Sequence, residues 1–378
     1  MAVETIAPVA DLVPKKARRE SQLALMWRRF RQHQLAVVSL WIVVAFYLVA
    51  ALAEFLAPTD PSAYSARYTY APPQGINFVV QNEDGGWSFM PHVNGYRSEI
   101  DPAAMRRTFV IDPEEIIPVR FFAPSEPYRL AGFIPMSIKL IGVENPRDPF
   151  YILGADRLGR DLLSRLIHGT RISLSIGLAG VTLSLFFGII IGGFAGYYGG
   201  LFDSAVMRVI EFIRSLPTIP LWLGLAAALP KDWNALQTYF AITIILSLIG
   251  WTELARVVRG RFLSLRTEDF VTAAQLDGAS DWRIITRHMV PSFTSHIIAA
   301  ATLAIPGMIL AETALSFLGL GLQAPIVSWG TLLQEAQNIR TLATAPWLLT
   351  PGICVVVVIL ALNFFGDGLR DAADPHGR

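Results

Sequence analysis

Six apolar stretches, each long enough to cross a lipid bilayer, constrain the fold of this chain more than any other feature. A membrane-spanning helix needs about 20 mostly apolar residues. The stretches cover residues 35–55, 172–197, 205–229, 238–258, 297–320 and 347–365. Only 16% of the 378 residues are charged, against about 25% in an ordinary soluble domain. The sequence therefore predicts an all-α integral membrane protein with six transmembrane helices.

Basic residues predict how the chain lies in the membrane. Lysine and arginine concentrate on the cytoplasmic side of membrane proteins, and a cleaved signal peptide has an apolar core of only about 7–15 residues. The basic residues before the first stretch are Lys15, Lys16, Arg18, Arg19, Arg28, Arg29 and Arg31. We therefore expect an uncleaved signal anchor, a short interfacial helix over residues 27–34 that leads into the first span, and both termini in the cytoplasm.

Particular residues predict how individual segments behave. The second stretch is rich in glycine, which lets helices approach closely in lipid. Pro217 and Pro220 should kink or break the third stretch. Residues 158–167 place leucine and isoleucine on one helical face and charged residues on the other, which predicts an amphipathic helix along the membrane surface.

Residues 58–150 differ in composition from the rest of the chain. They hold 13 of the 24 prolines and many scattered aromatic residues, without a helical period. The first span would place them outside the cytoplasm, as an irregular periplasmic insert. The insert is either an ordered, proline-rich spacer or a docking surface or cap over a substrate entrance, because aromatic residues among prolines provide rigid contact area.

A charged segment, residues 259–295, lies between the fourth and fifth stretches. We expect two short helices broken at Gly278, with Ser280 as the N-cap of a helix over residues 281–289. Polar residues surround Phe270, Trp282 and Ile285, as in the core and rim of a protein interface. The physical pattern leaves two interpretations open: a docking site, or a solvated loop whose apolar residues pack against the membrane helices.

Residues 272–291 resemble the EAA loop of ABC-importer permeases. Ala273, Ala274, Gly278 and Pro291 fit the spacing of that motif without a gap. Thr272 stands where the motif has glutamate, and His288 and Val290 replace isoleucine and leucine.

Further segments narrow the resemblance to the peptide/opine/nickel branch of these permeases and to the C-type subunit of oligopeptide and dipeptide permeases. They cover residues 27–31, 154–165, 312–321, 328–330 and 366–375, in the family's order. The insert is longer than the common family pattern, so the resemblance gives it no role.

The resemblance implies the partners of this chain. They are a second homologous permease subunit in a heterodimer, two ATPase subunits or domains that hold ATP and Mg²⁺, and a periplasmic substrate-binding protein. The chain itself would bind no cofactor or metal and would import substrate by alternating access. The resemblance also implies that the chain is a multi-pass protein of a bacterial cell inner membrane.

The resemblance also implies a division of the chain and a site. Residues 1–57 would hold the cytoplasmic N-terminus, entry helix and first span, residues 58–150 the insert, residues 151–366 the permease core with the ATPase-coupling loop, and residues 367–378 a cytoplasmic tail. The residues expected to couple to the ATPase are Thr272, Ala273, Ala274, Asp277, Gly278, Asp281, Trp282, Arg283 and Pro291.

A secondary transporter and an enzyme are the alternatives to an ABC-importer permease. A secondary transporter should show inverted repeats and mid-membrane ionisable residues. No repeat is visible, and Arg208, Glu211 and Arg214 have the spacing of neutralising ion pairs. Glu312 either lines a pathway or packs against a polar partner. The candidate pathway or gate residues are Pro217, Pro220, Met308 and Glu312.

An enzyme is the second alternative. The chain has no P-loop, no GxSxG motif, no dinucleotide fingerprint and no metal-ligand spacing among its histidines. Its net charge of +1 does not indicate a nucleic-acid partner. We therefore expect a non-catalytic subunit. Within the branch that it resembles, oligopeptides are the favoured substrate, and an oligosaccharide or an opine is the alternative.

Overall fold

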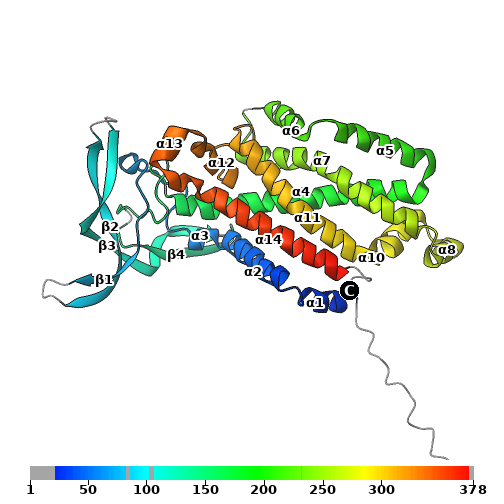
Figure 1. Ribbon diagram of the computed structural model, residues 1–378, viewed down its shortest axis with the longest axis horizontal. Helices are drawn as coiled ribbons and strands as arrows, with labels where there is room; N and C mark the ends of the chain where they lie inside the picture. The colour runs from blue at the N-terminus through cyan, green and yellow to red at the C-terminus, as the bar shows by residue number, and fades with distance from the viewer. Residues whose placement is uncertain (1–21, 82–85, 102–105, 146, 231, 374–378) are drawn as a thin grey trace, which may run out of the picture.

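The protein consists of a long helical bundle with a β-sheet at one end (Figure 1). The computed structural model describes residues 22–81, 86–101, 106–145, 147–230 and 232–373. The longer helices are α1 (Gln22–Phe30), α2 (Gln34–Ala51), α4 (Leu162–Tyr198), α5 (Gly200–Ser215), α6 (Thr218–Ala227), α7 (Ala235–Leu265), α8 (Asp269–Leu276), α11 (Thr294–Phe317) and α14 (Thr350–Ala373). The shorter ones are α3 (Ala53–Leu56), η2 (Ala66–Tyr68), α9 (Asp281–Arg283), η3 (Ile284–Met289), α10 (Val290–Ser292), α12 (Trp329–Gln334), η4 (Glu335–Gln337), α13 (Ile339–Thr344) and η5 (Pro346–Leu349).

Within the described residues, five helical segments are long and apolar enough to cross a membrane: α2, α4, α7, α11 and η5 together with α14. Helices α5 and α6 pass the same test together, but they are bent by 84° at the break between them. Pro217 is the N-cap of α6 and Pro220 lies in its first turn, as expected from the proline pair. Successive crossings alternate in direction along the bundle (Figure 1). The six-span prediction is confirmed when the bent pair counts as one crossing.

Glycines bring α4 and α7 into close contact along the bundle. Gly188, Gly192 and Gly196 recur every four residues on α4, on the side that faces Leu254, Ala255 and Arg259 of α7. A Cβ atom on Gly192 would lie only 2.2 Å from the carbonyl oxygen of Ala255. Small residues at such intervals let two backbones touch in lipid, where burial of apolar surface gives no gain over the lipid itself. The glycine-rich second stretch therefore packs as its sequence predicts.

The two ends of the described chain meet at the end of the bundle opposite the sheet (Figure 1). Helix α1 is the predicted entry helix, shifted toward the N-terminus, and its Phe30 is buried against Phe365 of α14. Helix α14 continues to Ala373, so the tail expected from residue 367 begins as helix instead. The basic residues 15–19 and residues 374–378 lie outside the described residues.

The sequence predicted an irregular insert, and this prediction is wrong. The insert contains a four-stranded antiparallel sheet. Its strands follow one another in the order β1 (Asn77–Gln81), β2 (Trp87–Asp101), β3 (Arg106–Leu130) and β4 (Ile134–Val143). Pairing is irregular between Asn94 and Gly95 and between Pro124 and Tyr128. Proline has no N–H for a ladder and is tolerated at edges and bulges. The prolines within these strands therefore hid the alternation of apolar and polar residues that would have predicted the strands.

The prediction of an amphipathic surface helix over residues 158–167 is also wrong. Helix α4 begins at Leu162, capped by the Asp161 carboxylate, which accepts hydrogen bonds from the backbone N–H groups of Leu163 (3.3 Å) and Ser164 (2.8 Å). Burial raises the pKa of Asp161 to about 6, although these hydrogen bonds oppose it. Residues 162–167 are thus the first turns of a transmembrane helix rather than a separate helix on the membrane surface.

The charges of this segment face protein rather than solvent. Arg165 is buried and forms an ion pair with Asp156, which also accepts a hydrogen bond of 2.6 Å from Arg160. Glu335, from η4, lies 3.4 Å from Arg160 and 3.7 Å from Arg165. Burial raises the pKa of Glu335, and the neighbouring charge of Asp156 acts in the same direction. This charged cluster joins the start of α4 to the segment that follows α12.

We expect Gly192→Ala to destabilise the helical bundle, because its new methyl group meets the backbone of α7. Overpacking of this kind typically costs about 1–3 kcal/mol. Gly260→Ala is the matched control, since a Cβ on this glycine of α7 meets no described atom within 4 Å. Thermal unfolding in detergent should give a lower Tm for Gly192→Ala only. Equal Tm values for the two variants would contradict the close packing of α4 and α7.

Candidate functional site

A helical hairpin, residues 266–293, connects α7 to α11 at the end of the bundle opposite the sheet (Figure 1). Its first arm, α8, ends at Leu276, and Gly278 follows with φ +74°. The backbone N–H of Ala279 donates to the carbonyl of Ala274 (3.1 Å), and that of Gly278 donates to Gln275 (3.0 Å). These two bonds form a Schellman motif, which requires a left-handed residue that glycine adopts without strain. The predicted break at Gly278 is confirmed.

The second arm begins where the sequence predicts, but it is not a regular α-helix. Ser280 occupies the N-cap position of α9, yet its side chain makes no capping hydrogen bond within the described residues. After one turn the arm continues as a π-helix over Ile284–Met289, and Pro291 lies in the short α10. π-Helical turns are rare and occur frequently at functional sites.

The inner face of the hairpin forms a hydrophobic core with the membrane helices. Its fully or nearly fully buried side chains pack against Val258 and Phe262 of α7 and Ile297 of α11. The hairpin residues in this core are Val271, Ala274, Ile284, Ile285, Met289 and Phe293. The docking interpretation placed Ile285 in the centre of an exposed interface, and its burial corrects that placement. For this residue the structure has the packing against the membrane helices that the other interpretation predicted.

Polar and aromatic contacts hold the hairpin to the end of α4. The Asp281 carboxylate accepts hydrogen bonds from the hydroxyl groups of Tyr197 (2.9 Å) and Tyr198 (2.7 Å). The Trp282 ring stacks on Phe194, with ring centroids 6.0 Å apart. No role was expected for these three aromatic residues of α4 from the sequence. The adjacent tyrosines at the end of a glycine-rich span were the available signal.

The outer face of the hairpin carries most of the residues predicted to couple to an ATPase. Trp282 remains 56% exposed despite its stack on Phe194. The other exposed members of the predicted set are Thr272, Ala273, Asp277, Gly278, Arg283 and Pro291. Ala274 is buried in the hairpin core, and Asp281 is half-buried because it accepts the tyrosine hydrogen bonds. The structure therefore divides the predicted set into an outer surface and two residues that hold the hairpin in place.

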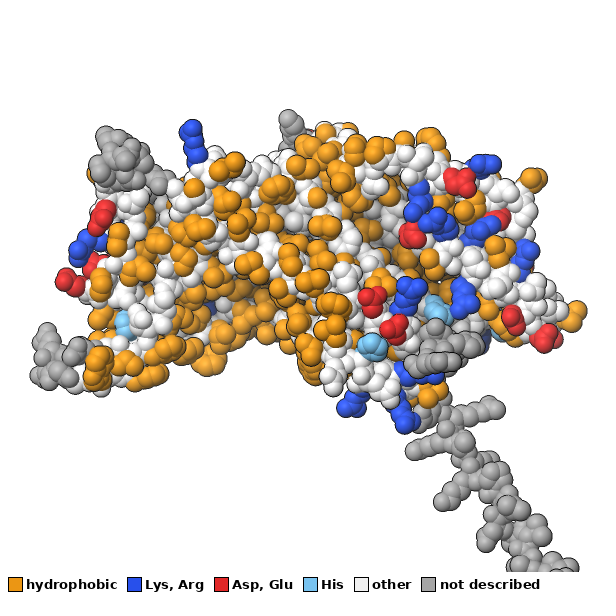
Figure 2. Space-filling model, viewed as in Figure 1, with side chains coloured by type: hydrophobic (Ala, Val, Ile, Leu, Met, Phe, Trp, Pro, Cys, Tyr) orange, Lys and Arg blue, Asp and Glu red, His pale blue; other side chains and the backbone are white. Residues whose placement is uncertain are grey.

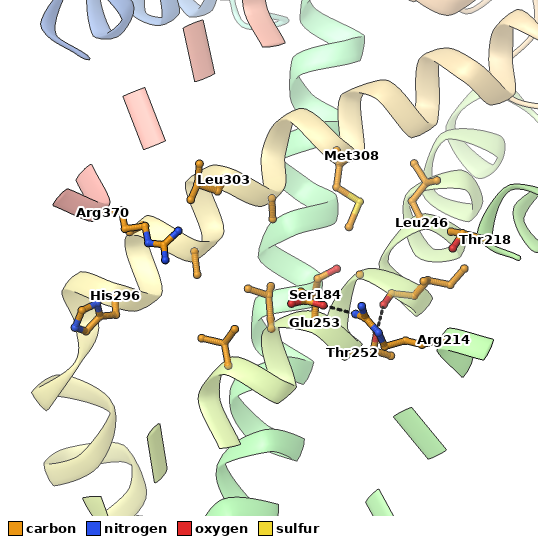
Figure 3. Close-up of a pocket in the computed structure, with 18 of the residues that line it drawn as sticks. Ser184, Arg214, Thr218, Leu246, Thr252, Glu253, His296, Leu303, Met308 and Arg370 are labelled. Atoms are coloured by element: carbon orange, nitrogen blue, oxygen red, sulfur yellow. Dashed lines mark hydrogen bonds and ion pairs between the residues drawn. The ribbon is translucent and has the colours of Figure 1, made fainter. Parts of the chain in front are cut away.

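An intramembrane cavity of about 810 Å³ lies between α7 and α11 and extends to α4, α5, α6 and α14 (Figure 3). Small residues of α11 form much of one wall. They are Ala299, Ala300, Ala304 and Gly307, followed by Met308. Such a wall leaves space because these side chains, Met308 excepted, are short.

Charged side chains gather at the cavity wall nearest the hairpin. Arg214 pairs with Glu253 (Figure 3), and Arg256 also contacts Glu253 at 3.0 Å. Arg261 lies 2.9 Å from the imidazole of His296. The ion-pair prediction on α5 holds for Arg208 and Glu211 (3.2 Å), but Arg214 reaches across to α7 instead. Helix α5 lies against α7 in the fold, a contact that spacing along one helix could not reveal.

The four predicted pathway residues lie in different places. Met308 lines the cavity, whereas Pro217 and Pro220 lie at the bend between α5 and α6 and are not among its lining residues. Glu312 is fully buried and accepts hydrogen bonds from the hydroxyl groups of three serines: Ser173 (3.3 Å), Ser316 (2.8 Å) and Ser328 (2.7 Å). These contacts join α11 to α4 and α12 away from the cavity. The geometry thus supports the packing interpretation of Glu312.

Comparison with known proteins gives two matching families. The profile of "Binding-protein-dependent transport system inner membrane component" matches residues 188–378. That of "N-terminal TM domain of oligopeptide transport permease C" matches residues 21–73. The two matches lie on either side of the sheet.

Individual proteins are similar over most of the chain. The dipeptide transport system permease protein DppC of Lactococcus lactis is 32% identical over 93% of this chain and 89% of its own length. The oligopeptide transport system permease protein OppC of Haemophilus influenzae is 40% identical over 61% of this chain and 71% of its own length. A chain from an inward-facing structure of the MetNI methionine ABC transporter aligns with 56% of this chain and 97% of its own length, at 22% identity and a TM-score of 0.42.

We predict that Gly278→Val loosens the hairpin while Gly278→Asn preserves it. Space is not the limit, because a Cβ on Gly278 meets no described atom within 4 Å. The left-handed backbone costs an ordinary residue about 1–2 kcal/mol, and asparagine tolerates it far better than a β-branched valine. Amide hydrogen exchange should accelerate in α8 and η3 of Gly278→Val alone. Unchanged exchange in that variant would show that the turn does not depend on its glycine.

Proposed function

Since this chain belongs to the family of binding-protein-dependent transport system inner membrane components, we propose that it passes oligopeptides from the periplasm to the cytoplasm as one half of a heterodimeric permease. The chain is a non-catalytic, multi-pass inner-membrane subunit of an ABC importer. Its family implies ATPase and substrate-binding partners. The substrate class, the second homologous permease subunit and the orientation of the termini are parts of the proposal.

The observation that carries the proposal is the hairpin, with one face buried against α7 and α11 and the other exposed. Two partner ATPase subunits or domains, with ATP and Mg²⁺, would bind the exposed face. Because the buried face and the Asp281–tyrosine bonds fix the hairpin to three spans, a displacement of the hairpin would move those spans as well. Such contacts would convert a displacement of the hairpin into a rigid-body motion of the spans to which it is bound.

The intramembrane cavity is our candidate for this chain's part of the pathway. The short side chains of α11 provide room, and Met308 would be one of the residues that substrate passes. Arg261 and Arg370 supply positive charge in the cavity wall, whereas the charge of Arg214 is balanced by its partner Glu253. Peptides carry a terminal carboxylate that arginine binds well, whereas a neutral oligosaccharide offers no such group. Peptides therefore fit this wall better, in agreement with the names of the relatives.

The sheet would lie on the periplasmic side of the transporter and form a binding surface there. Trp87 and Phe89 are among the most exposed large apolar side chains of the protein, and Phe89 stacks on Phe78 with ring centroids 6.2 Å apart. Exposed aromatic side chains on a fixed backbone are typical of binding surfaces. We propose that this surface contacts the substrate-binding protein or covers the entrance to the pathway.

The function is tested by uptake into proteoliposomes. The chain is reconstituted with its partner permease, ATPases and binding protein, and labelled peptides and oligosaccharides are offered with and without ATP. We expect ATP-dependent, vanadate-sensitive accumulation of peptides. Uptake driven by an ion gradient without ATP would identify a secondary transporter instead, and uptake of oligosaccharides alone would overturn the peptide assignment.

Trp282→Ala should weaken binding of the ATPase. A buried tryptophan at an interface commonly contributes 2 kcal/mol or more, which corresponds to about a 30-fold loss of affinity. The control is Phe194→Ala, which removes the stacking partner of Trp282 but lies on α4 rather than on the hairpin. Titration of the purified permease with ATPase measures both affinities. If Phe194→Ala weakens binding as much as Trp282→Ala does, Trp282 acts by packing on α4 and not by contacting the ATPase.

Cysteine labelling tests the orientation of the chain. In a Cys354→Ala background, Ser98→Cys on β2 should react with a membrane-impermeant maleimide once the outer membrane is opened. Thr272→Cys on the outer face of the hairpin should react only when the inner membrane is also permeabilised. Both positions are exposed in the structure. The reverse pattern would place the hairpin in the periplasm, where no ATPase could reach it.

A further inference from the structure

The hairpin between β3 and β4 is fixed to the outer end of the first span. Phe122 of β3 lies against Phe55 of α3, with ring centroids 6.4 Å apart. At the turn, the backbone N–H of Ala131 donates to the Glu54 carboxylate (3.4 Å). Lys139 of β4 donates to the carbonyl of Ala57 (2.9 Å). These contacts hold the sheet beside the point at which the chain leaves the first span.

The same hairpin exposes large apolar side chains. Phe122 is 65% exposed and Phe133 is 73% exposed, and Phe121, Ile134 and Ile138 are also exposed. The backbone of Phe122 has φ +55°, which is uncommon for a bulky residue and is strained. A contiguous apolar surface on a soluble part of a protein usually marks a binding site or a membrane contact.

The length of α2 places this hairpin at the surface of the bilayer. Its 18 residues span about 27 Å at 1.5 Å per residue, close to the hydrocarbon thickness of about 30 Å. Helix α3 therefore lies at the boundary between hydrocarbon and headgroups. Glu54 and Arg171 form an ion pair there, with Nη2 and Oε2 2.7 Å apart, as expected where charge meets the headgroups. Tryptophan and tyrosine concentrate at this depth in membrane proteins, and phenylalanine is among the residues that segments lying in the interface bury in it.

The apolar surface of the hairpin continues the surface that α2 presents to lipid. Trp41 and Leu48 of α2, and its C-cap residue Leu52, are exposed in the structure, although the helix is a membrane span. Figure 2 shows hydrophobic side chains extending from the bundle onto the sheet end of the molecule. The lipid that covers α2 therefore meets the β3–β4 hairpin next.

We propose that the β3–β4 hairpin is a membrane anchor whose apolar side chains, Phe122 and Phe133 above all, lie in the headgroup region of the outer leaflet. The occupant of this surface is lipid, in contrast to the Trp87 and Phe89 surface, which lies on the β1–β2 hairpin. The anchor would fix the tilt of the sheet relative to the membrane and so hold the rest of the insert in a constant position.

Spin labels report this placement directly. Phe133→Cys and Phe122→Cys are made separately in a Cys354→Ala background, and the purified chain with its permease partner is placed in nanodiscs of phosphatidylethanolamine and phosphatidylglycerol. Power saturation compares collisions of the label with oxygen, which concentrates in lipid, and with a water-soluble nickel chelate. Ser98→Cys, exposed on β2, is the aqueous control.

We expect both labels on the β3–β4 hairpin to collide more with oxygen and less with the nickel chelate than the label at Ser98 does. The ratio of the two collision rates should then be that of a label within the membrane. Nickel collisions equal to those at Ser98 would place the hairpin in water and overturn the proposal. Low collision with both reagents and an immobilised spectrum would also overturn it, because protein would then cover the surface. None of these outcomes depends on the transported substrate.

Discussion

Helix α4 and helix α7 touch along their backbones because Gly188, Gly192 and Gly196 have no side chains. Much of the remaining architecture depends on this contact. Lipid tails are as apolar as the side chains, so burying apolar surface between helices gives no gain in free energy over contact with lipid. Close van der Waals packing and buried hydrogen bonds must therefore hold the bundle together. The α4–α7 contact fixes the two walls between which α11 packs. It thereby defines where the intramembrane cavity can lie.

Helix α4 also connects the two ends of the molecule, over about 55 Å for its 37 residues. At the end beside the sheet, Arg165 joins the charged cluster with Asp156 and Glu335. At the opposite end, Tyr197 and Tyr198 hold the helical hairpin of residues 266–293 through Asp281. A continuous helix resists bending because each turn is hydrogen-bonded to the next. We infer that a push on the hairpin reaches the cavity through α4 and α7.

The sequence predicted those parts of the fold that depend on local pattern. Apolar length located the spans, and Gly278 located the turn of the hairpin, because only a left-handed residue completes that helix end. Contacts between distant segments were not visible in the sequence. Arg165 was placed on a solvated face because the cluster that buries it includes Glu335, 170 residues further on, beside its ion-pair partner Asp156. The strands were hidden by prolines such as Pro113, which lies in the stretch of β3 whose pairing with β2 is irregular.

We propose that the helical hairpin of residues 266–293 and α4 move as one body during transport. Double electron–electron resonance between Thr272→Cys on the hairpin and Phe186→Cys on α4, both exposed, tests it in a Cys354→Ala background. The complete transporter is measured without nucleotide and with ATP trapped by vanadate. We predict the same distance distribution in both states, although the cavity changes shape. A shift or marked broadening of the distribution with nucleotide would contradict the claim, because the hairpin would then move independently of the helix to which it is bonded.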